Sequence, residues 1–476
     1  MRRTKIVATL GPACQTQDRI RELVEAGADV FRLNFSHGDH EFHAMLIATV
    51  RRVSIETGRF IPVVGDIQGP KIRIGEVDGT VLLRSGEPFT ITTEPLMGDG
   101  RRVSTPFTAL PQQVSEGDRI LINDGLVELA VRRIEGRAVE TEVIYGGPIA
   151  SKKGMNFPDT ELTIPAITEK DVEDLRFAAE HDVDYIAASF IRRKEDIEQI
   201  RKHLASHGRE DIPVIAKIEK AQAVENLDAI LELSDGVMVA RGDLGVELAP
   251  ESVPIVQKRL LEWASHRGRI GITATQMLES MTASSRPTRA EASDVANAIF
   301  DGSDAVMLSA ETATGAYPVE TVRMMSRIVT TAEQHPELRV HQGRDPAHES
   351  FETDEFTDAL AGAGSYAAEQ LDAKYIVVFT QTGFTARLMS KFRPAAPIIA
   401  LTSTSRVARR MNLLWGVVPY IVKDVGSYHE QIVEKVEQFL IERGMVVAGD
   451  RVVILMGSPI YQRARTNLLR VHRVGG

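Results

Sequence analysis

The chain has 476 residues, of which 43% are hydrophobic and 26% charged, and this composition predicts a globular protein of about three domains rather than a disordered one. Its net charge of -10 argues against nucleic acid as the main partner, because broad binding to a polyanion needs excess positive charge. A single cysteine, Cys14, allows no internal disulfide and favours a reducing, cytoplasmic setting, and no window has the roughly 18 apolar residues that a membrane span needs.

The first half of the chain alternates short β-branched runs with amphipathic, helix-like stretches. The apolar runs, in order, are "TKIVATL", "ADVFRLN", "IPVVGDI", "VDYIAASF", "PVIAKIE", "DGVMVA", "RIGITAT" and "DAVMLSA". Strands separated by helices in this way predict an α/β fold of eight βα units, a (β/α)8 TIM barrel. An open, doubly wound sheet is the alternative that the pattern leaves open.

One connection, after the third run, is far longer than the others and carries few helical signals. It contains the strand-like runs "DGTVLLRSGEPFTITTE", "GDRILINDG" and "GRAVETEVIYGG". A structureless loop of that length is implausible in a compact domain. We therefore expect an inserted all-β lid domain at residues 71–164, which leaves residues 1–70 and 165–340 to the barrel.

The polar stretch "RVHQGRDPAHES" reads as a linker, after which the α/β pattern restarts. The runs "YIVVFT", "PIIALT", "VVPYIV" and "RVVILMG" predict a C-terminal α/β domain at residues 345–476. Within it, "GAGSYA" (362–367) superficially matches a dinucleotide fingerprint. That fingerprint follows a strand and opens a helix, whereas here it lies in a helical stretch that leads into a strand.

Ionisable and polar residues gather where the predicted barrel strands end, which is where barrels of this kind carry their chemistry. These residues are Arg32, Asn34, Ser36, His37, Asp66, Lys71, Arg73, Lys217, Glu219, Arg241, Gly242, Asp243, Thr275, Gln276, Ser309 and Glu311. A single polar residue at a strand end is more often a cap or a turn residue. The joint pattern is harder to explain in that way, since many strands contribute to one mouth.

A lysine and two carboxylates at this mouth indicate the kind of chemistry. Lys217 ends an apolar strand, a costly place for a charge without a bound anion or a paired acid. Glu219 and Asp243 follow successive strands and could share one Mg²⁺, which accepts one or two carboxylates. Basic residues beside such a metal favour phosphoryl transfer, where positioning and charge neutralisation dominate.

Long, mutually ordered motifs then resemble the pyruvate kinase family. They are "KIVATLGPA", "RLNFSHG", "GDIQGPKIR", "SKKGMNFP", "AKIEK", "MVARGDLGVE", "TATQMLESM" and "SRPTRAEASDVANAIFDGSDAVMLSAETATGAYPVE". The likeness runs from residue 4 to about 335 and continues more weakly beyond. It implies a glycolytic, cytoplasmic homotetramer that transfers a phosphoryl group from phosphoenolpyruvate to ADP, with Mg²⁺ as cofactor and Mn²⁺ as a substitute.

The resemblance also implies a role for each matching position. Lys217 would stabilise the transferring phosphoryl group and the enolate, and Arg32 would hold the phosphate of phosphoenolpyruvate. Glu219 and Asp243 match the metal ligands. The substrate carboxylate would lie at Gly242 and Thr275, with Thr275 also in a water-mediated proton path. The positions facing the nucleotide phosphates are Asn34, Ser36, His37, Arg73 and Lys153, and those supporting the site from behind are Ser309 and Glu311.

Lys71 stands at a position that bears on a monovalent cation. Many pyruvate kinases bind K⁺ through Asn, Ser, Asp, a following Thr and a nearby Glu. Asn34, Ser36 and Asp66 are retained here, but Ile67 replaces the Thr and Lys71 the Glu. A lysine ammonium carries the same single charge, so the resemblance predicts that Lys71 replaces K⁺ and that K⁺ is not required. A solvated lysine near the lid hinge is the alternative.

The stretch "FTQTGFTARLMSKFRP" puts Thr380, Thr382 and Thr385 at a turn between a strand and a helix. Hydroxyls and free amides there could hold a phosphate. Relatives bind a sugar-phosphate or nucleotide activator at the matching loop, although Phe384 stands where some carry a basic residue. An ordinary capped helix is the alternative.

Two other functions are compatible with parts of the pattern. A metal-dependent barrel lyase acting on a pyruvate enolate would need neither Arg73 and Lys153 nor the lid. An inactive relative serving as a sugar-phosphate sensor should have lost Lys217, Glu219 or Asp243, and all three are present.

Overall fold

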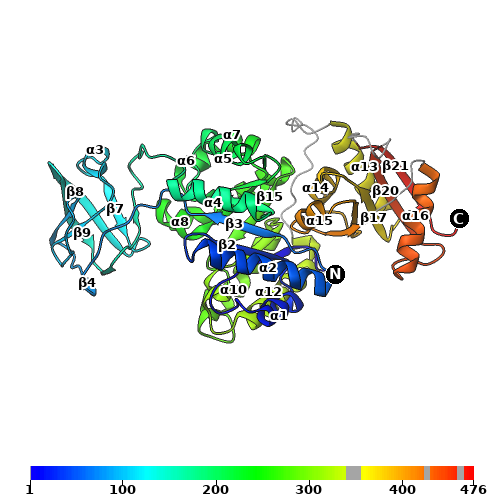
Figure 1. Cartoon of the computed structure of the whole chain (residues 1–476), viewed down its shortest axis with the longest axis horizontal. Helices are drawn as coiled ribbons and strands as arrows, with labels where there is room; N and C mark the ends of the chain where they lie inside the picture. The colour runs from blue at the N-terminus through cyan, green and yellow to red at the C-terminus, as the bar shows by residue number, and fades with distance from the viewer. Residues whose placement is uncertain (1, 339–354, 423–428, 458–465) are drawn as a thin grey trace.

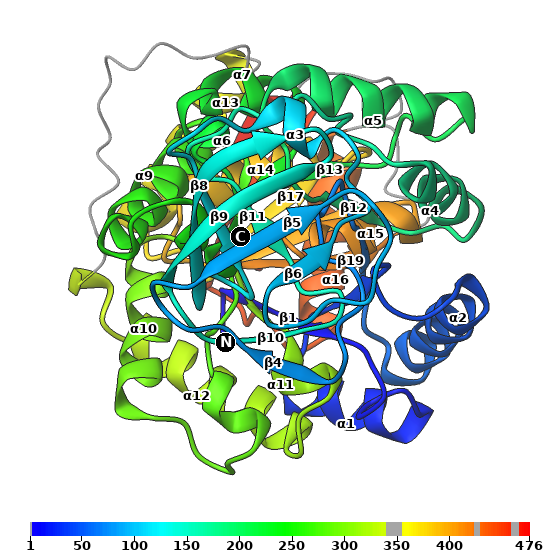
Figure 2. The same cartoon turned by 90° about the vertical axis from the view of Figure 1, so that its left-hand side faces the viewer.

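The computed structural model describes residues 2–338, 355–422, 429–457 and 466–476. Three bodies follow one another along the long axis of the molecule, with the lid at one end, the barrel in the middle and the C-terminal domain at the other end (Figure 1). Seen from the lid end, the lid strands lie in front of the barrel (Figure 2).

Eight parallel strands close into a barrel, which confirms the predicted (β/α)8 fold and excludes the open sheet. The order around the barrel is β1-β16-β15-β14-β13-β12-β3-β2. The strands are β1 (Lys5–Thr9), β2 (Val30–Asn34), β3 (Val63–Ile67), β12 (Tyr185–Ala188), β13 (Val214–Ile218), β14 (Gly236–Ala240), β15 (Ile270–Ala274) and β16 (Ala305–Leu308). Nearly every residue in them is buried, as expected of strands covered on both faces.

Helices surround the barrel, and their ends follow local sequence signals. The first begins where the Thr16 side chain accepts a hydrogen bond from the Arg19 amide, and it ends at Gly27, whose φ of 120° suits glycine. The helices are α1 (Gln17–Ala26), α2 (His40–Thr57), α4 (Glu169–Glu180), α5 (Lys194–Ser206), α6 (Ala221–Glu225), α7 (Leu227–Leu233), α8 (Arg241–Glu247), α9 (Val253–His266), α10 (Arg289–Phe300), α11 (Ala310–Ala313) and α12 (Pro318–Glu333).

The lid, inserted between β3 and α4, has a hydrophobic core of its own around Phe89, Ile91 and Val131. Its strands are β4 (Thr80–Leu82), β5 (Pro88–Thr92), β6 (Arg102–Ser104), β7 (Arg119–Ile122), β8 (Val127–Glu135), β9 (Ala138–Tyr145), β10 (Pro148–Ala150) and β11 (Met155–Asn156), with one short helix, α3 (Leu110–Gln113). Six of these strands form one sheet, in the order β11-β7-β8-β9-β5-β6, and β10 pairs with β4.

The C-terminal domain is a five-stranded sheet in the order β19-β18-β17-β20-β21. Its elements are α13 (Glu355–Gln370), β17 (Tyr375–Phe379), α14 (Phe384–Lys391), β18 (Ile398–Thr402), α15 (Ser405–Met411), β19 (Val417–Ile421), α16 (His429–Glu442), β20 (Arg451–Gly457) and β21 (Thr466–Arg473). The antiparallel β21 was not predicted. "GAGSYA" lies inside α13, and most of the expected linker lies outside the described residues.

The C-terminal domain packs against the end of the barrel where the strands begin. Lys5, the first residue of β1, donates from Nζ to the Val417 carbonyl oxygen at 2.8 Å. Tyr185, the first residue of β12, donates to the Arg410 carbonyl oxygen at 2.7 Å. The opposite end, where the strands finish, therefore faces the lid. Within the described part of the chain, no helix is both long and apolar enough to span a membrane.

Candidate active site between barrel and lid

Lys217 lies at the centre of a buried charge cluster at the mouth of the barrel. Its Nζ is 3.0 Å from Glu219 Oε1 and 3.3 Å from Asp66 Oδ1, and it donates to Ser189 Oγ at 2.6 Å. Parallel strands β3, β12 and β13 are neighbours in the barrel, so their carboxyl ends bring these side chains together. Lys217, for which the sequence predicted a bound anion or a paired acid, is paired with two acids, Asp66 and Glu219.

Arg32 enters the same cluster from β2. Its Nε lies 2.6 Å from Asp66 Oδ2, and its Nη1 donates to Thr9 Oγ1 at 3.1 Å. Asp66 thus bridges two cations, one through each carboxylate oxygen. Since the Arg32 side chain is only 9% exposed, Asp66 fixes the guanidinium in a largely water-free place where it can meet an anion.

Glu219 is held in place by an unusual backbone conformation. The amide of Phe190 donates to Glu219 Oε2 at 2.7 Å. Phe190 adopts a positive φ of 56°, which is sparsely populated for a bulky residue and is therefore held by its surroundings. The result is a carboxylate with one oxygen on Lys217 and the other on a backbone amide.

The charges of the cluster shift one another's pKa values. Burial raises the pKa of Asp66, but Arg32 and Lys217 outweigh it and the pKa falls below its usual value. Burial lowers the pKa of Lys217, but Asp66 and Glu219 raise it above the usual range, so the ammonium is retained. Burial raises the pKa of Glu219, and Asp243 raises it further against the opposing effect of Lys217.

The pair Glu219 and Asp243 suits a hard divalent cation. The raised pKa of Glu219 means that Lys217 does not fully compensate its buried charge, and additional positive charge there would be favourable. Within residues 2–338, 355–422, 429–457 and 466–476, no group of three or more acidic, histidine or cysteine side chains forms a metal site. Two carboxylates are nevertheless enough for Mg²⁺, which takes its other ligands from water and substrate oxygens.

Lys71 reaches the mouth from the start of the lid segment. Its Nζ lies 3.1 Å from Asp243 Oδ1 and 5.9 Å from the centre of the Phe190 ring. The lid approaches it closely, since a Cβ on Gly154 would lie 3.1 Å from Lys71 Cε. Among the described contacts Lys71 pairs with Asp243, and none joins it to Asn34, Ser36 or Asp66, the residues grouped with it by sequence.

Gly242 and Thr275 meet at the start of α8. The Gly242 amide donates to Thr275 Oγ1 at 2.8 Å, and Arg241 Nη2 donates to the Thr275 carbonyl oxygen at 2.8 Å. Thr275 and Gln276 both have positive φ, 66° and 55°, and this conformation is strained above all for the β-branched Thr275. These contacts hold the threonine hydroxyl beside the first amides of the helix.

The remaining predicted residues lie around this centre. Ser36 donates its amide to Asn34 Oδ1 at 3.2 Å, and the exposed His37 follows in the same turn. Arg73 donates to the Lys152 carbonyl oxygen at 3.0 Å, which places it in the lid beside Lys153.

Ser309 and Glu311 form a small unit at the end of β16. Glu311 is fully buried, accepts the Ser309 amide at Oε2 (2.6 Å) and accepts the Leu278 amide at Oε1 (3.2 Å). It joins the loops after β15 and β16, and so supports the mouth from behind.

The threonines of the C-terminal domain lie far along the chain and at the other end of the molecule. Thr380 Oγ1 accepts the Gly383 amide at 2.9 Å, and Thr385 Oγ1 lies 2.7 Å from Thr466 Oγ1. Both are buried, whereas Thr382 is exposed and accepts the Phe384 amide at 3.4 Å. The exposed hydroxyl of Thr382 is therefore the accessible one.

Two residues of the charge cluster were missed in the sequence. Ser189, directly after β12, contacts both Lys217 and Asp66, and Thr9, at the end of β1, contacts Arg32. The strand-end rule that selected the others applies equally to these two positions. Contacts between lid and barrel, such as that of Lys71 with Asp243, have no comparable signal in the sequence, because the strand-end rule does not predict how the lid lies against the barrel.

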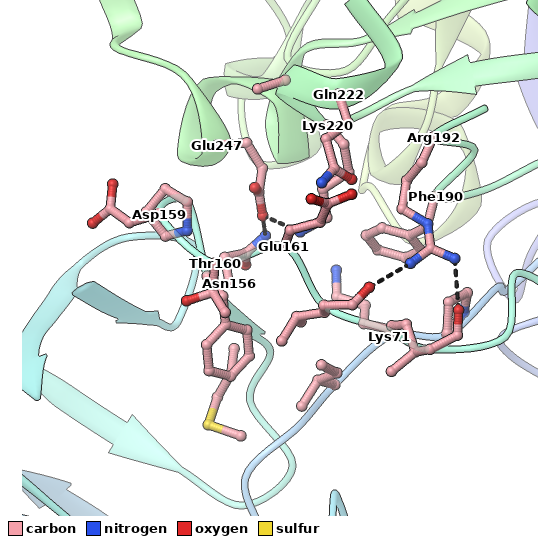
Figure 3. Close-up of a pocket in the computed structure, with 18 of the residues that line it drawn as sticks. Lys71, Asn156, Asp159, Thr160, Glu161, Phe190, Arg192, Lys220, Gln222 and Glu247 are labelled. Carbon is pink, nitrogen blue, oxygen red and sulfur yellow. Dashed lines mark hydrogen bonds and ion pairs between the residues drawn. The ribbon is translucent and has the colours of Figure 1, made fainter. Parts of the chain in front are cut away.

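A cleft of about 240 Å³ opens between lid and barrel beside Lys71 (Figure 3). Its labelled polar lining includes Asn156 from the lid and Lys220, Arg192 and Glu247 from the barrel. Arg192 donates to the Leu162 and Ile164 carbonyl oxygens at 2.9 and 2.7 Å, which ties the returning lid segment to the barrel.

Comparison with known proteins agrees with this geometry. The family model described as "Pyruvate kinase, barrel domain" matches residues 1–322, and "Pyruvate kinase, alpha/beta domain" matches residues 358–472. The chain is 45% identical to a pyruvate kinase of Geobacillus stearothermophilus, over 99% of this chain and 80% of that one. It is 44% identical to a pyruvate kinase of Mycobacterium tuberculosis, over 100% and 99%.

A solved structure extends the likeness to the fold. The crystal structure of a pyruvate kinase from Cryptosporidium parvum superimposes with a TM-score of 0.90 and 34% identity, covering 99% of this chain and 96% of that one. With both family models matched in order and relatives this similar along the whole chain, the protein belongs to the pyruvate kinase family.

Proposed function

We propose that this pyruvate kinase acts with Mg²⁺ held by Glu219 and Asp243, and that Lys217, Arg32 and Thr275 carry the reaction of phosphoenolpyruvate with ADP. The observation that carries the proposal is the buried Lys217 ammonium between Asp66 and Glu219 at the barrel mouth. A fixed cation in a largely dry site interacts strongly with charge that develops during reaction.

Each residue has a task that follows from its chemistry. Arg32, fixed by Asp66, binds the phosphate of phosphoenolpyruvate as a guanidinium fork. Lys217 neutralises charge on the phosphoryl group in transfer and then on the enolate oxygen. The backbone near Gly242, together with Thr275, receives the substrate carboxylate, and Thr275 takes part in the proton path to the enolate through water.

A bound Mg²⁺ would supply further charge neutralisation for the phosphoryl and enolate oxygens. The other proposed roles are those of side chains of the protein itself. Asn34, Ser36, His37, Arg73 and Lys153 orient the phosphates of ADP, while Ser309 and Glu311 keep the loops at the mouth in register. A lid spanning residues 71–164 closes over the reactants and excludes water that would hydrolyse the phosphate.

Lys71 is proposed to supply the positive charge that K⁺ supplies in other members, so that K⁺ is not required. Its pairing with Asp243 supports a role at the mouth rather than in solvent, since only 24% of each side chain is exposed. In this proposal the ammonium, near Asn34, Ser36 and Asp66 at the mouth, helps to orient the nucleotide phosphates and to close the lid.

Regulation and assembly are proposed on the resemblance and the C-terminal geometry. A sugar phosphate or nucleotide would bind at the turn carrying Thr380, Thr382 and Thr385 and activate the enzyme. The protein would work as a cytoplasmic homotetramer with domain limits at 1–70 with 165–340, 71–164 and 345–476.

The metal site is tested by Asp243→Asn, which keeps the size of the side chain but removes one charge. The Mg²⁺ concentration for half-maximal activity should rise roughly tenfold or more, as expected when about 1.4 kcal/mol or more of metal affinity is lost. Asp228→Asn, a change at an exposed carboxylate of α7 paired with Arg267, serves as the control. An unchanged Mg²⁺ titration for Asp243→Asn would place the metal elsewhere.

A further inference from the structure

One carboxylate in the cleft between lid and barrel makes contacts that none of the proposed roles explains. Glu247 Oε1 accepts a hydrogen bond from Asn156 Nδ2 at 2.6 Å and forms an ion pair with Lys220 (Figure 3). The Glu247 side chain is only 4% exposed, and Asn156 is 5% exposed. A buried charge between two domains is costly unless its partners are in place, so this contact specifies one relative position of the two.

The position of Glu247 in the chain connects that contact to the mouth of the barrel. It is the last residue of α8, whose first turn carries Gly242 and Asp243. Its partner Lys220 directly follows Glu219. Its other partner, Asn156, ends the last strand of the lid. The carboxylate of Glu247, which lies on the helix that carries Asp243, therefore contacts both the lid and the segment that carries Glu219.

A second contact reinforces the link to Glu219. The Lys220 ammonium lies 6.0 Å from the centre of the Phe190 ring, close enough for a cation–π interaction. The Phe190 amide holds Glu219 Oε2. Displacing Lys220 would thus disturb Glu219 both through the adjacent backbone and through Phe190.

We propose that Glu247 is a positioning residue that makes the arrangement of Glu219 and Asp243 depend on the position of the lid. The carboxylate accepts Asn156 only when the lid is in this position, and in doing so it keeps Lys220 and α8 in register. The inference rests on the proposed metal-binding role of Glu219 and Asp243. Glu247 itself contacts neither substrate nor metal in this scheme.

The test is a double-mutant cycle read out as the Mg²⁺ concentration for half-maximal activity. Asn156→Ala removes a hydrogen bond to the buried Glu247 carboxylate, and Glu247→Ala removes that carboxylate and leaves Lys220 without its acid; each should raise that concentration roughly tenfold or more. The double variant should be no worse than Glu247→Ala alone, since both changes break one contact. Glu225→Gln, which removes an exposed carboxylate from the same cleft, is the matched control.

A rescue experiment separates the contact from the fold. Asn156→Asp alone places a second carboxylate against that of Glu247. It should raise the half-saturating Mg²⁺ concentration more than any other variant of this set. Adding Glu247→Gln restores the hydrogen bond in the reversed direction, with the glutamine at 247 donating to the aspartate at 156. The double variant should therefore recover most of the lost Mg²⁺ affinity. These variants also stay informative if Glu247→Ala fails to fold.

Two outcomes would overturn the inference: a half-saturating Mg²⁺ concentration unchanged in both single variants, or effects that multiply in the double variant without rescue by the reversed pair. A lower Tm with unchanged Mg²⁺ dependence would mean a purely structural contact and would overturn it as well. Asp243→Asn distinguishes failure of the positioning role from failure of the metal site. If the half-saturating Mg²⁺ concentration changes in Asp243→Asn but not in the Asn156 and Glu247 variants, only the positioning role of Glu247 is contradicted.

Discussion

At the scale of single residues, the site consists of cations and carboxylates that hold one another in place. Asp66 joins Arg32 to Lys217, and Lys217 joins Asp66 to Glu219. Removing the Lys217 ammonium leaves Glu219 without its cation, and a replacement of similar length limits the change to that one charge.

Lys217→Met is such a replacement and should act mainly on the transition state. We expect kcat to fall about 10²–10³-fold, the range for loss of one fixed electrostatic contact, with a much smaller change in the KM for phosphoenolpyruvate. Steady-state kinetics beside Lys202→Met, an exposed lysine on α5, provide the comparison. Near-normal turnover would remove Lys217 from the reaction.

The sequence identified most of the residues in this cluster because one rule places them. Strands of a parallel barrel end at one mouth, so Arg32, Asp66, Lys217 and Glu219 are predictably close. The rule does not say which cation pairs with which acid. The pairing of Lys71 with Asp243 depends on how the lid returns to the barrel, and no local pattern encodes that.

At the scale of elements, the sequence predicts strands and helices most reliably where an element is buried along its whole length. The barrel strands are nearly all apolar and covered on both faces, which makes their runs unmistakable. The antiparallel β21 was missed because "TNLLRVHR" shows no regular alternation and carries two arginines; only its first residue is buried, and the others are half-buried or exposed. The limits of the lid stay a prediction, since a hinge is set by contacts such as those of Arg192 rather than by composition.

The turn before α14 gives a prediction at this scale. If a phosphorylated metabolite binds there, a panel of sugar phosphates and nucleotides should contain one that lowers the phosphoenolpyruvate concentration for half-maximal rate. Thr382→Val removes the exposed hydroxyl and should weaken that shift severalfold, by about the 0.5–1.5 kcal/mol of one hydrogen bond. Thr330→Val, at an exposed threonine of α12, is the control. Regulation at this turn is ruled out if no metabolite shifts the curve.

At the scale of the whole molecule, the barrel is held between the lid and the C-terminal domain. The lid meets the mouth through charged side chains such as Lys71 and Asp243. The C-terminal domain meets the other end through ion pairs such as Arg409 with Asp184 and Arg393 with Asp304, and through apolar packing and buried polar groups. Lys5 is one of these groups, only 6% exposed, with its ammonium on the Val417 carbonyl oxygen. Burial lowers the pKa of Lys5 from its usual 10.5 to about 8.

This depressed pKa predicts a pH-dependent stability. Between about pH 8 and 10.5 the unfolded lysine binds a proton that the folded one has lost, so stability rises with pH across that window. The contribution is lost again as the pH falls through about 8. Over some 2.5 pH units at 1.36 kcal/mol each it amounts to about 3 kcal/mol.

The comparison that isolates Lys5 is urea unfolding of the protein and of Lys5→Met between pH 7 and 10. The protein should gain stability relative to Lys5→Met as the pH rises, whereas Lys374→Met, at an exposed lysine, should run parallel to it. A constant difference between the protein and Lys5→Met would mean that Lys5 titrates normally.

The most direct measurement for the whole scheme is pyruvate formation from phosphoenolpyruvate, ADP and Mg²⁺ in K⁺-free buffer, with tetramethylammonium at matched ionic strength. We expect full, ADP-dependent and Mg²⁺-dependent activity without K⁺, and Lys71→Glu should lose activity there and regain part of it when K⁺ is added. Strong stimulation of the unaltered protein by K⁺ would contradict the role of Lys71, and pyruvate formation that needs no ADP would contradict the proposed reaction itself.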